Sequence, residues 1–354
     1  MEKRKEPPSP GHSGILIKRQ RGEAVPSTEI AISSGGNDRG QLIRTIQRTS
    51  GLEAPIISLS GAHTSEILSC RFDPTGQNIA ACGADRSVSL WRTYPPNTNY
   101  GLLPNLHKAA ILDLQWSLTS PMLYTVSADK TIGSRRIRAH SGVINSLDRV
   151  VAGGSELLAT GADDGKVKVW KSDEKESIAD WDLGCPVTSV CWSPDGAQIY
   201  AGALDNVIHV YDLRKQEVVM ALRGHTDIPS SLSVSPSGNY LLSPSFSSNT
   251  IVWDIRPFSP SPSRIHRVLQ GAPAGFENTL SRAAWSQEDG GKRVAVGGAD
   301  RTVTIWDVES TRVLYKLPGH KGTVTSVDFH PKEPIILTGS TDATMLLGEI
   351  ERSI

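Results

Sequence analysis

The chain carries a repeated spacing of His, Asp and Trp residues. His63 and Asp85 lie 22 residues apart, as do His320 and Asp342, and Trp91 follows Asp85 by 6 residues. The equivalent places of the other repeats hold His107, Asp129, His140, Asp164, Trp170, Asp205, Tyr211, His225, Trp253, Asp300 and Trp306. A period of about 40 to 45 residues with a Trp-Asp signature is typical of four-stranded propeller blades. We therefore expect the function to lie on the surfaces of a disc and not in a catalytic cleft.

The length of the repeating part sets the number of blades. It runs from residue 55 to residue 350, and a repeat of about 42 residues fits into this span seven times. The 32 Gly and 22 Pro residues punctuate short runs rich in Val, Ile, Leu and Thr, as expected for strands joined by tight turns. Residues 54–59 should supply the strand that the last repeat lacks, which closes the ring. The sequence predicts an all-β, seven-bladed propeller.

The first 50 residues differ in charge from the rest of the chain. They hold nine Lys and Arg against five Asp and Glu, a net charge of +4, so the remainder carries −4. Their low aromatic content predicts a disordered basic tail over residues 1–52, followed by the propeller over residues 53–354. Two basic clusters of this tail form a candidate nuclear import signal, made of Lys3, Arg4, Lys5, Lys18, Arg19 and Arg21. We expect a nuclear protein whose acidic body makes only indirect or minor contact with RNA.

The His and Cys residues form no catalytic or metal-binding motif. Five of the nine His residues recur at the same place in successive repeats. Each should form a hydrogen bond with the Asp of its own blade, and the five His residues should lie too far apart around the disc to bind one metal ion. The four Cys residues lack a Cys-x-x-Cys pair and resemble buried, reduced thiols of an intracellular protein. The chain has no run of 18 apolar residues and no apolar leader. We expect a non-enzymatic protein without cofactor, metal, membrane contact or small-molecule substrate.

Basic residues follow the repeated Asp in three repeats. Arg86, Lys130 and Arg301 each come directly after it and should project from the rim of one face of the disc. Arg is enriched in protein-recognition hot spots, although a solvated loop cation is the alternative at each position. These three residues are candidate partner-binding residues.

The repeats resemble those of the WD40 family over most of the chain. Several stretches, residues 17–21, 253–258, 276–282, 314–320 and 347–350, are similar to WD40 subunits of the U5 small nuclear ribonucleoprotein of the spliceosome. This resemblance implies a nuclear, non-enzymatic scaffold in pre-mRNA splicing. It also implies spliceosomal protein partners, chiefly the large central scaffold protein of that particle, bound by a monomer within a large assembly.

The second repeat departs from the family pattern. Asp129 and His140 are only 11 residues apart, where Asp85 and His107 are 22 apart, and no Trp-Asp follows Asp129. About ten residues are missing by this comparison, which predicts a truncated blade two that lacks an inner strand and exposes a sheet edge. We interpret the gap as a misplaced exon boundary in the translated gene and not as a tolerated deletion.

The fifth repeat lacks the repeated Asp. Ser247 or Ser248 occupies its place, and the segment is one residue short. His225 should therefore lack a charged partner, and we expect blade five to be the more mobile one.

Two other functions remain open. Arg214 and Arg256 belong to W-D-x-R boxes, one with Tyr in place of Trp, which resemble those of substrate receptors of cullin–RING ubiquitin ligases. In that case both Arg residues would bind the ligase adaptor. An enzyme would need acid–base groups or metal ligands converging in the central channel, and the even placing of His and Trp leaves few candidates for that.

Overall fold

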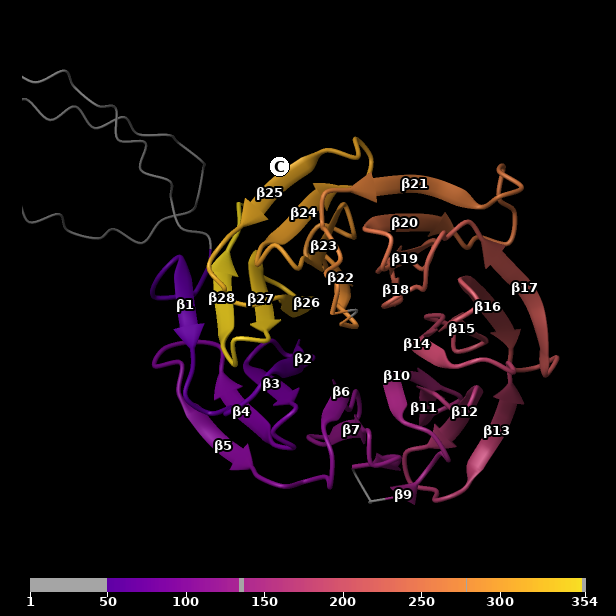
Figure 1. Ribbon diagram of the computed structural model, residues 1–354, viewed down its shortest axis with the longest axis horizontal. Helices are drawn as coiled ribbons and strands as arrows, with labels where there is room; N and C mark the ends of the chain where they lie inside the picture. Colours follow the sequence, from indigo (N-terminus) through magenta and orange to yellow (C-terminus); the bar gives the residue numbers. More distant parts are fainter. Residues whose placement is uncertain (1–49, 134–136, 278, 352–354) are drawn as a thin grey trace, which may run out of the picture. The chain divides into compact units, whose positions relative to one another are not determined.

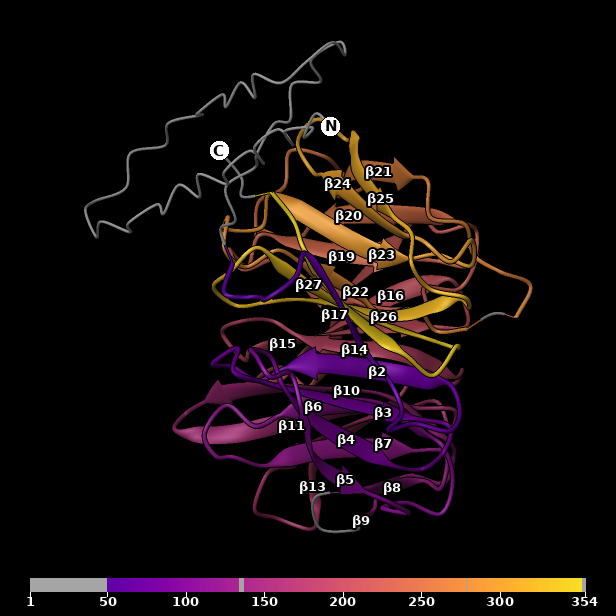
Figure 2. The ribbon, with the colours of Figure 1, turned by 90° about the vertical axis from the view of Figure 1, so that its left-hand side faces the viewer.

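The computed structural model describes residues 50–133, 137–277 and 279–351, which form seven four-stranded antiparallel sheets around a central axis (Figure 1). The prediction of an all-β, seven-bladed propeller is confirmed. Seen edge-on, the strands run between the two faces of the disc (Figure 2). Within the described residues no helix is long and apolar enough to span a membrane.

The first four blades follow one another along the chain. Blade one comprises β2 (Ile67–Phe72), β3 (Asn78–Gly83), β4 (Val88–Arg92) and β5 (Asn99–Leu103). Blade two comprises β6 (Ile111–Trp116), β7 (Leu123–Ser127), β8 (Thr131–Ile132) and β9 (Ile137–Arg138). Blade three comprises β10 (Ile144–Ala152), β11 (Ser155–Ala162), β12 (Lys166–Lys171) and β13 (Ser177–Asp182). Blade four comprises β14 (Val187–Trp192), β15 (Gln198–Ala203), β16 (Val207–Asp212) and β17 (Glu217–Arg223).

The last three blades complete the ring. Blade five comprises β18 (Ser233–Val234), β19 (Tyr240–Pro244), β20 (Asn249–Asp254) and β21 (Ile265–Gln270). Blade six comprises β22 (Ala283–Trp285), β23 (Arg293–Gly297), β24 (Val303–Asp307) and β25 (Val313–Leu317). Blade seven comprises β26 (Val324–Phe329), β27 (Ile335–Ser340), β28 (Met345–Glu349) and β1 (Ile56–Leu59).

The ring closes through the strand at the start of the described chain. β1 pairs antiparallel with β28, with Ile56 opposite Gly348 and Leu59 opposite Met345. The predicted closure by residues 54–59 is confirmed. The backbone N–H of Ser50 also donates to the Glu349 carboxylate at 3.0 Å, so the chain is tied to blade seven before β1 begins. Closure pairs the edge of β28 that would otherwise be open to other chains.

Turn residues and core residues explain why these segments form blades. In the turns between first and second strands, the N–H groups of Gly76, Gly196 and Gly238 donate to a carbonyl three residues earlier. Each of these Gly residues has a positive φ, which Gly adopts without a Cβ clash. In blade four the first and second strands are almost wholly buried, whereas the outermost strand is mostly exposed or half-buried, with only Leu222 buried. Most of the core therefore lies between the faces of adjacent blades.

Blade two is shortened at its outer side. Its two inner strands are complete, and Ile111, Leu114, Tyr124 and Val126 are fully buried. The outer strands β8 and β9 have two residues each. The expectation that an inner strand is missing is therefore wrong. Inner strands pack against both neighbouring blades, so the missing residues shorten the outer strands β8 and β9 instead.

Candidate functional site

In blade one a chain of hydrogen bonds joins the loop before the first strand to the third strand. His63 Nδ1 lies 2.9 Å from Asp85 Oδ2, and His63 Nε2 lies 2.8 Å from the Ser89 hydroxyl. That hydroxyl accepts the indole N–H of Trp91 at 3.0 Å. An ionised carboxylate can only accept, so Nδ1 carries the proton. Blade three has a similar chain through His140, Asp164, Thr160 and Trp170, in which the hydroxyl of Thr160 belongs to the second strand.

Blades two and seven have the His–Asp pair without the Trp. His107 Nδ1 lies 3.1 Å from Asp129, and His320 Nδ1 lies 3.2 Å from Asp342. Burial lowers the pKa of His320, although Asp342 opposes this, so the imidazole is neutral near pH 7. These pairs hold each blade together by hydrogen bonds.

Blade five has a His without an Asp. The His225 Nε2 lies 2.5 Å from the Ser243 hydroxyl, but its buried Nδ1 has no hydrogen-bond partner among the described residues. Ser248 has the positive φ that Arg86 has in blade one, so Ser247 stands where Asp85 stands. Burial lowers the pKa of His225 to about 4.

The repeated Asp of blades four and six bonds other groups. Asp205 lies 2.9 Å from His209 Nε2 of the third strand, and Asp300 accepts from the Thr302 hydroxyl at 2.7 Å. Tyr211 packs on Trp181 of blade three with ring centroids 4.5 Å apart. In blade six the indole N–H of Trp306 donates to the carbonyl of Gln270. In blade five the buried indole nitrogen of Trp253 has no hydrogen-bond partner within the part of the chain that the structure describes.

The hydroxyl that links each His to its blade was missed by the sequence reasoning. In blades two, five and seven it belongs to Thr125, Ser243 and Thr338, each 18 residues after the His. A Ser or Thr at the same offset in these three repeats is the signal that could have revealed it, whereas in blades one and three the offsets are 26 and 20 residues.

The three rim residues occupy the same turn in their blades. Arg86, Lys130 and Arg301 have φ values of 63°, 70° and 66° in the turns between second and third strands. Arg86 and Arg301 are exposed, and Lys130 is half-buried. They share one face of the disc because these turns lie at the same end of antiparallel blades.

The two box residues lie at the other end of the third strand and therefore on the opposite face. The Arg256 guanidinium binds the Asp254 carboxylate through two nitrogens at 2.6 and 2.8 Å and holds the pKa of that carboxyl at about 2. Arg214 is exposed. The structure thus does not bring the five candidate basic residues together into one site. All six residues of the candidate nuclear signal lie outside the described residues.

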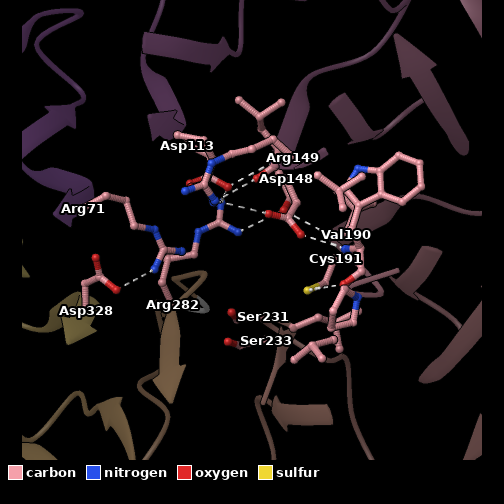
Figure 3. Close-up of a pocket in the computed structure, with 18 of the residues that line it drawn as sticks. Arg71, Asp113, Asp148, Arg149, Val190, Cys191, Ser231, Ser233, Arg282 and Asp328 are labelled. Atoms are coloured by element: carbon pink, nitrogen blue, oxygen red, sulfur yellow. Dashed lines mark hydrogen bonds and ion pairs between the residues drawn. The ribbon is translucent and has the colours of Figure 1, made fainter. Parts of the chain in front are cut away.

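Charged residues of the first strands, together with Arg282 of the loop before β22, line the central channel, a feature that the sequence reasoning did not predict. The channel holds a cavity of about 610 Å³ (Figure 3). Arg282 lies 3.4 Å from Asp113, and Arg71 lies 3.6 Å from Asp328. Charged residues within apolar strand segments, as in the stretch that contains Arg71, are the signal that could have found it.

The channel carboxylates also join neighbouring blades by hydrogen bonds. Asp113 accepts from the backbone N–H of Leu147, and Asp148 accepts from that of Trp192, each in the next blade. Burial raises the pKa of Asp148, and Arg149 opposes this only in part. Each Arg is matched by an Asp, so the channel offers no net positive charge to a nucleic acid. No group of His, Cys, Asp or Glu among the described side chains could hold a metal ion.

The fold and the blade signature define a WD40-type propeller. A family model described as "WD domain, G-beta repeat" matches residues 54–92, 134–171, 182–212, 216–254 and 311–347. The chain is 42% identical over 333 residues to a "U5 small nuclear ribonucleoprotein 40 kDa protein" of Dictyostelium discoideum, covering 91% of this chain and 92% of that protein.

Two further relatives are similar over nearly their whole lengths. The "Pre-mRNA-splicing factor cwf17" of Schizosaccharomyces pombe is 38% identical, covering 99% of this chain and 100% of that protein. The "U5 small nuclear ribonucleoprotein 40 kDa protein" of Homo sapiens is also 38% identical, covering 99% of each. The chain belongs to the WD40-repeat family and, within it, to the family of these 40 kDa proteins.

Proposed function

We propose that this protein is a non-enzymatic scaffold of the U5 small nuclear ribonucleoprotein in the nucleus and takes part in pre-mRNA splicing. One observation carries the proposal: proteins named for that particle or for splicing are 38–42% identical to this chain across 91–99% of its length. The propeller begins near residue 53, and the tail before it supplies the nuclear import signal.

The geometry supports a scaffold role. The basic turns of Arg86 and Arg301 lie on one face and Arg214 on the other, so two faces are open to different partners. The Asp residues of the channel offset its Arg residues, which supports contact with RNA that is indirect or minor. The protein acts as a monomer, chiefly on the large central scaffold protein of the particle.

The rim residues provide a test of the proposed partner. We expect Arg86→Asn with Arg301→Asn to weaken binding to the large U5 scaffold protein by about tenfold or more, because hot-spot Arg residues supply well over 1 kcal/mol each. Asn tolerates the positive φ of both turns. Arg214→Asn is the matched control and should bind as the wild type does.

Binding is measured by interferometry with purified full-length proteins. Equal affinities of the rim variant and the wild type would remove the rim from the interface. Loss of binding in Arg214→Asn, together with capture of a cullin adaptor, would instead favour the ligase-receptor alternative.

A further inference from the structure

The loop that joins β20 to β21 in blade five is longer than the equivalent loops of four other blades (Figure 1). It comprises ten residues, 255–264. The same connection comprises residues 93–98 in blade one, 172–176 in blade three, 213–216 in blade four and 308–312 in blade six. The side chain of Phe258 in this loop is 93% exposed, so the extra residues pack little on the propeller. The loop is therefore open to another protein.

Two Ser-Pro dipeptides of this loop lie in extended backbone. Ser259-Pro260 and Ser261-Pro262 follow Pro257. Each Pro ring fixes φ at about −65° and pushes the residue before it away from helical backbone and toward extended backbone. The chain turns back only after Pro262, where the N–H of Arg264 donates to the carbonyl of Ser261 at 3.1 Å. Protein kinases bind their substrates as extended segments, so the loop presents Ser-Pro in a suitable form.

Four other Ser-Pro dipeptides of the described residues are less accessible. Three of them have buried Ser residues, with exposures of 6%, 3% and 0%: Ser193, Ser235 and Ser243. Ser120 lies half-buried in the turn between β6 and β7, where its hydroxyl donates to the Ser117 hydroxyl at 3.0 Å. The Ser261 hydroxyl instead lies 3.0 Å from the hydroxyl of Ser263, an exposed residue of the same loop. A kinase can therefore reach Ser-Pro in this loop without opening a blade.

The residues after Ser261 match what one class of kinase selects. Pro lacks a backbone N–H, so a kinase pocket without an acceptor at that position takes Pro and excludes residues whose N–H would stay unpaired. Arg264 stands three residues after Ser261, where an anionic pocket of the kinase binds a guanidinium. Ser-Pro-x-Arg is the pattern that cyclin-dependent kinases select. Ser259 lacks it, because Pro262 stands where the basic residue is required.

We propose that Ser261 is a phosphorylation site of a proline-directed Ser/Thr kinase of the cyclin-dependent class. The Ser261 Oγ forms a bond to the γ-phosphorus of ATP, while the bond from that phosphorus to the bridging oxygen of ADP breaks. ADP leaves with the electron pair, and the hydroxyl proton passes to the catalytic Asp of the kinase. The product carries up to about two negative charges on the loop at neutral pH.

The phosphate changes the contacts that hold the loop. The Arg264 guanidinium donates to the carbonyl of Arg256 at 2.7 Å and to that of Pro257 at 3.3 Å. Both acceptors are neutral, whereas phosphate oxygens form stronger, charge-assisted hydrogen bonds. Ser261 and Arg264 are the two ends of one turn, so the phosphate competes for this guanidinium. Phosphorylation therefore loosens the loop and adds negative charge to the face of the disc that carries Arg214.

The test uses the native full-length protein, a purified cyclin-dependent kinase with its cyclin, and ATP. Site-resolved mass spectrometry should find phosphate on Ser261 and distinguish it from Ser9, which also precedes a Pro. The rate should lie within about tenfold of the rate for a synthetic peptide of residues 253–268, because the loop needs only a local opening.

Variants of the loop test the assignment. Pro262→Ala and Arg264→Asn should each slow phosphorylation of Ser261 by about tenfold or more, since each removes a contact that the kinase selects. Asn tolerates the φ of 57° at position 264. Ser263→Ala is the matched control, because it removes a neighbouring hydroxyl that no Pro follows, and it should react as the wild type does. Ser261→Ala should carry no phosphate in this loop.

Three outcomes in the purified system would overturn the proposal. These are phosphate on Ser259 in place of Ser261, equal rates for Pro262→Ala and the wild type, and a native protein that reacts more than about a hundredfold slower than the peptide. The phosphopeptide should also be present in protein purified from dividing cells with phosphatase inhibitors, and its absence there would reject the site. None of these results depends on whether the protein associates with U5.

Discussion

At the scale of single residues, the blades differ in how completely they satisfy a buried imidazole. His63 binds a carboxylate at one nitrogen and a hydroxyl at the other, whereas His225 binds, among the residues of the described ranges, only the Ser243 hydroxyl. A buried polar atom without a partner costs about 1–3 kcal/mol. Blade five therefore carries a local defect, whose cause is Ser247 at the place of the repeated Asp.

This defect predicts an acid-sensitive blade. The folded pKa of His225, about 4, lies below its unfolded value, so the unfolded state binds more protons. The stability associated with this His is fully present above pH 6.5 and is lost as the pH falls toward 4, by up to about 3 kcal/mol. Ser247→Asp supplies the missing carboxylate, raises the folded pKa and should flatten this loss. The free energy of unfolding of both proteins is measured by urea denaturation at pH values between 7 and 4.

The comparison of the two proteins separates His225 from other acid effects. Carboxyls such as Asp85 also lose stabilisation in acid, because hydrogen bonds from Ser87 and attraction to His63 outweigh burial and lower the pKa of that carboxyl. They contribute equally to both proteins. Parallel pH curves for wild type and Ser247→Asp would contradict the assignment of His225 as the sensitive group.

At the scale of elements, blade two remains attached although its outer strands are short. Glu156 of β11, in blade three, is buried and reaches the turn between β6 and β7. Its carboxylate accepts from the Leu118 N–H at 2.7 Å, the Ser117 hydroxyl at 2.6 Å and the Tyr124 hydroxyl at 2.9 Å. One carboxylate thus fixes the inner half of blade two to its neighbour.

Glu156→Ala should loosen this half-blade selectively. It leaves the buried hydroxyls of Ser117 and Tyr124, and the Leu118 N–H, without their acceptor, which costs about 2–4 kcal/mol. We expect faster amide hydrogen exchange over residues 117–127 with little change in blades five and six. Tyr124→Phe removes one donor only and should cost about 1 kcal/mol. Uniform exchange changes around the ring would contradict this local role of Glu156.

The elements also show what could be read from the sequence. The turns around Asp73 and Gly76 and the repeated Asp were predictable because local residues determine them. The length of β8 was not, because it depends on how the shortened segment after Asp129 divides between two outer strands. Pairs of residues from distant repeats, such as Arg282 and Asp113, could not be predicted, because only the closed ring brings them together.

At the scale of the whole molecule, contacts across the channel bind blades that are far apart in sequence. Arg282 of the loop before β22 donates to the carbonyl of Asn145 at 2.5 Å and to that of Leu112 at 3.3 Å. It also pairs with Asp113 of blade two. One buried guanidinium therefore links blade six to blades two and three.

Arg282→Met should destabilise the ring as a unit. It leaves Asp113 buried without its cation, which costs about 3–5 kcal/mol. Adding Asp113→Asn should recover part of this loss, because the uncompensated charge is then absent. Arg312→Met, at an exposed position, is the matched control. Urea midpoints measure all four proteins, and an unchanged midpoint in Arg282→Met would refute the cross-channel link.

The most direct measurement is an affinity purification of the endogenous protein from nuclear extract, with its peptides and bound RNA both sequenced. The account predicts U5 RNA and spliceosomal proteins, including the large scaffold protein. Peptides that span residues 129–140 would show the shortened blade as it exists in the cell, and longer peptides there would support a misplaced exon boundary. Recovery of a cullin adaptor without U5 RNA would contradict the account.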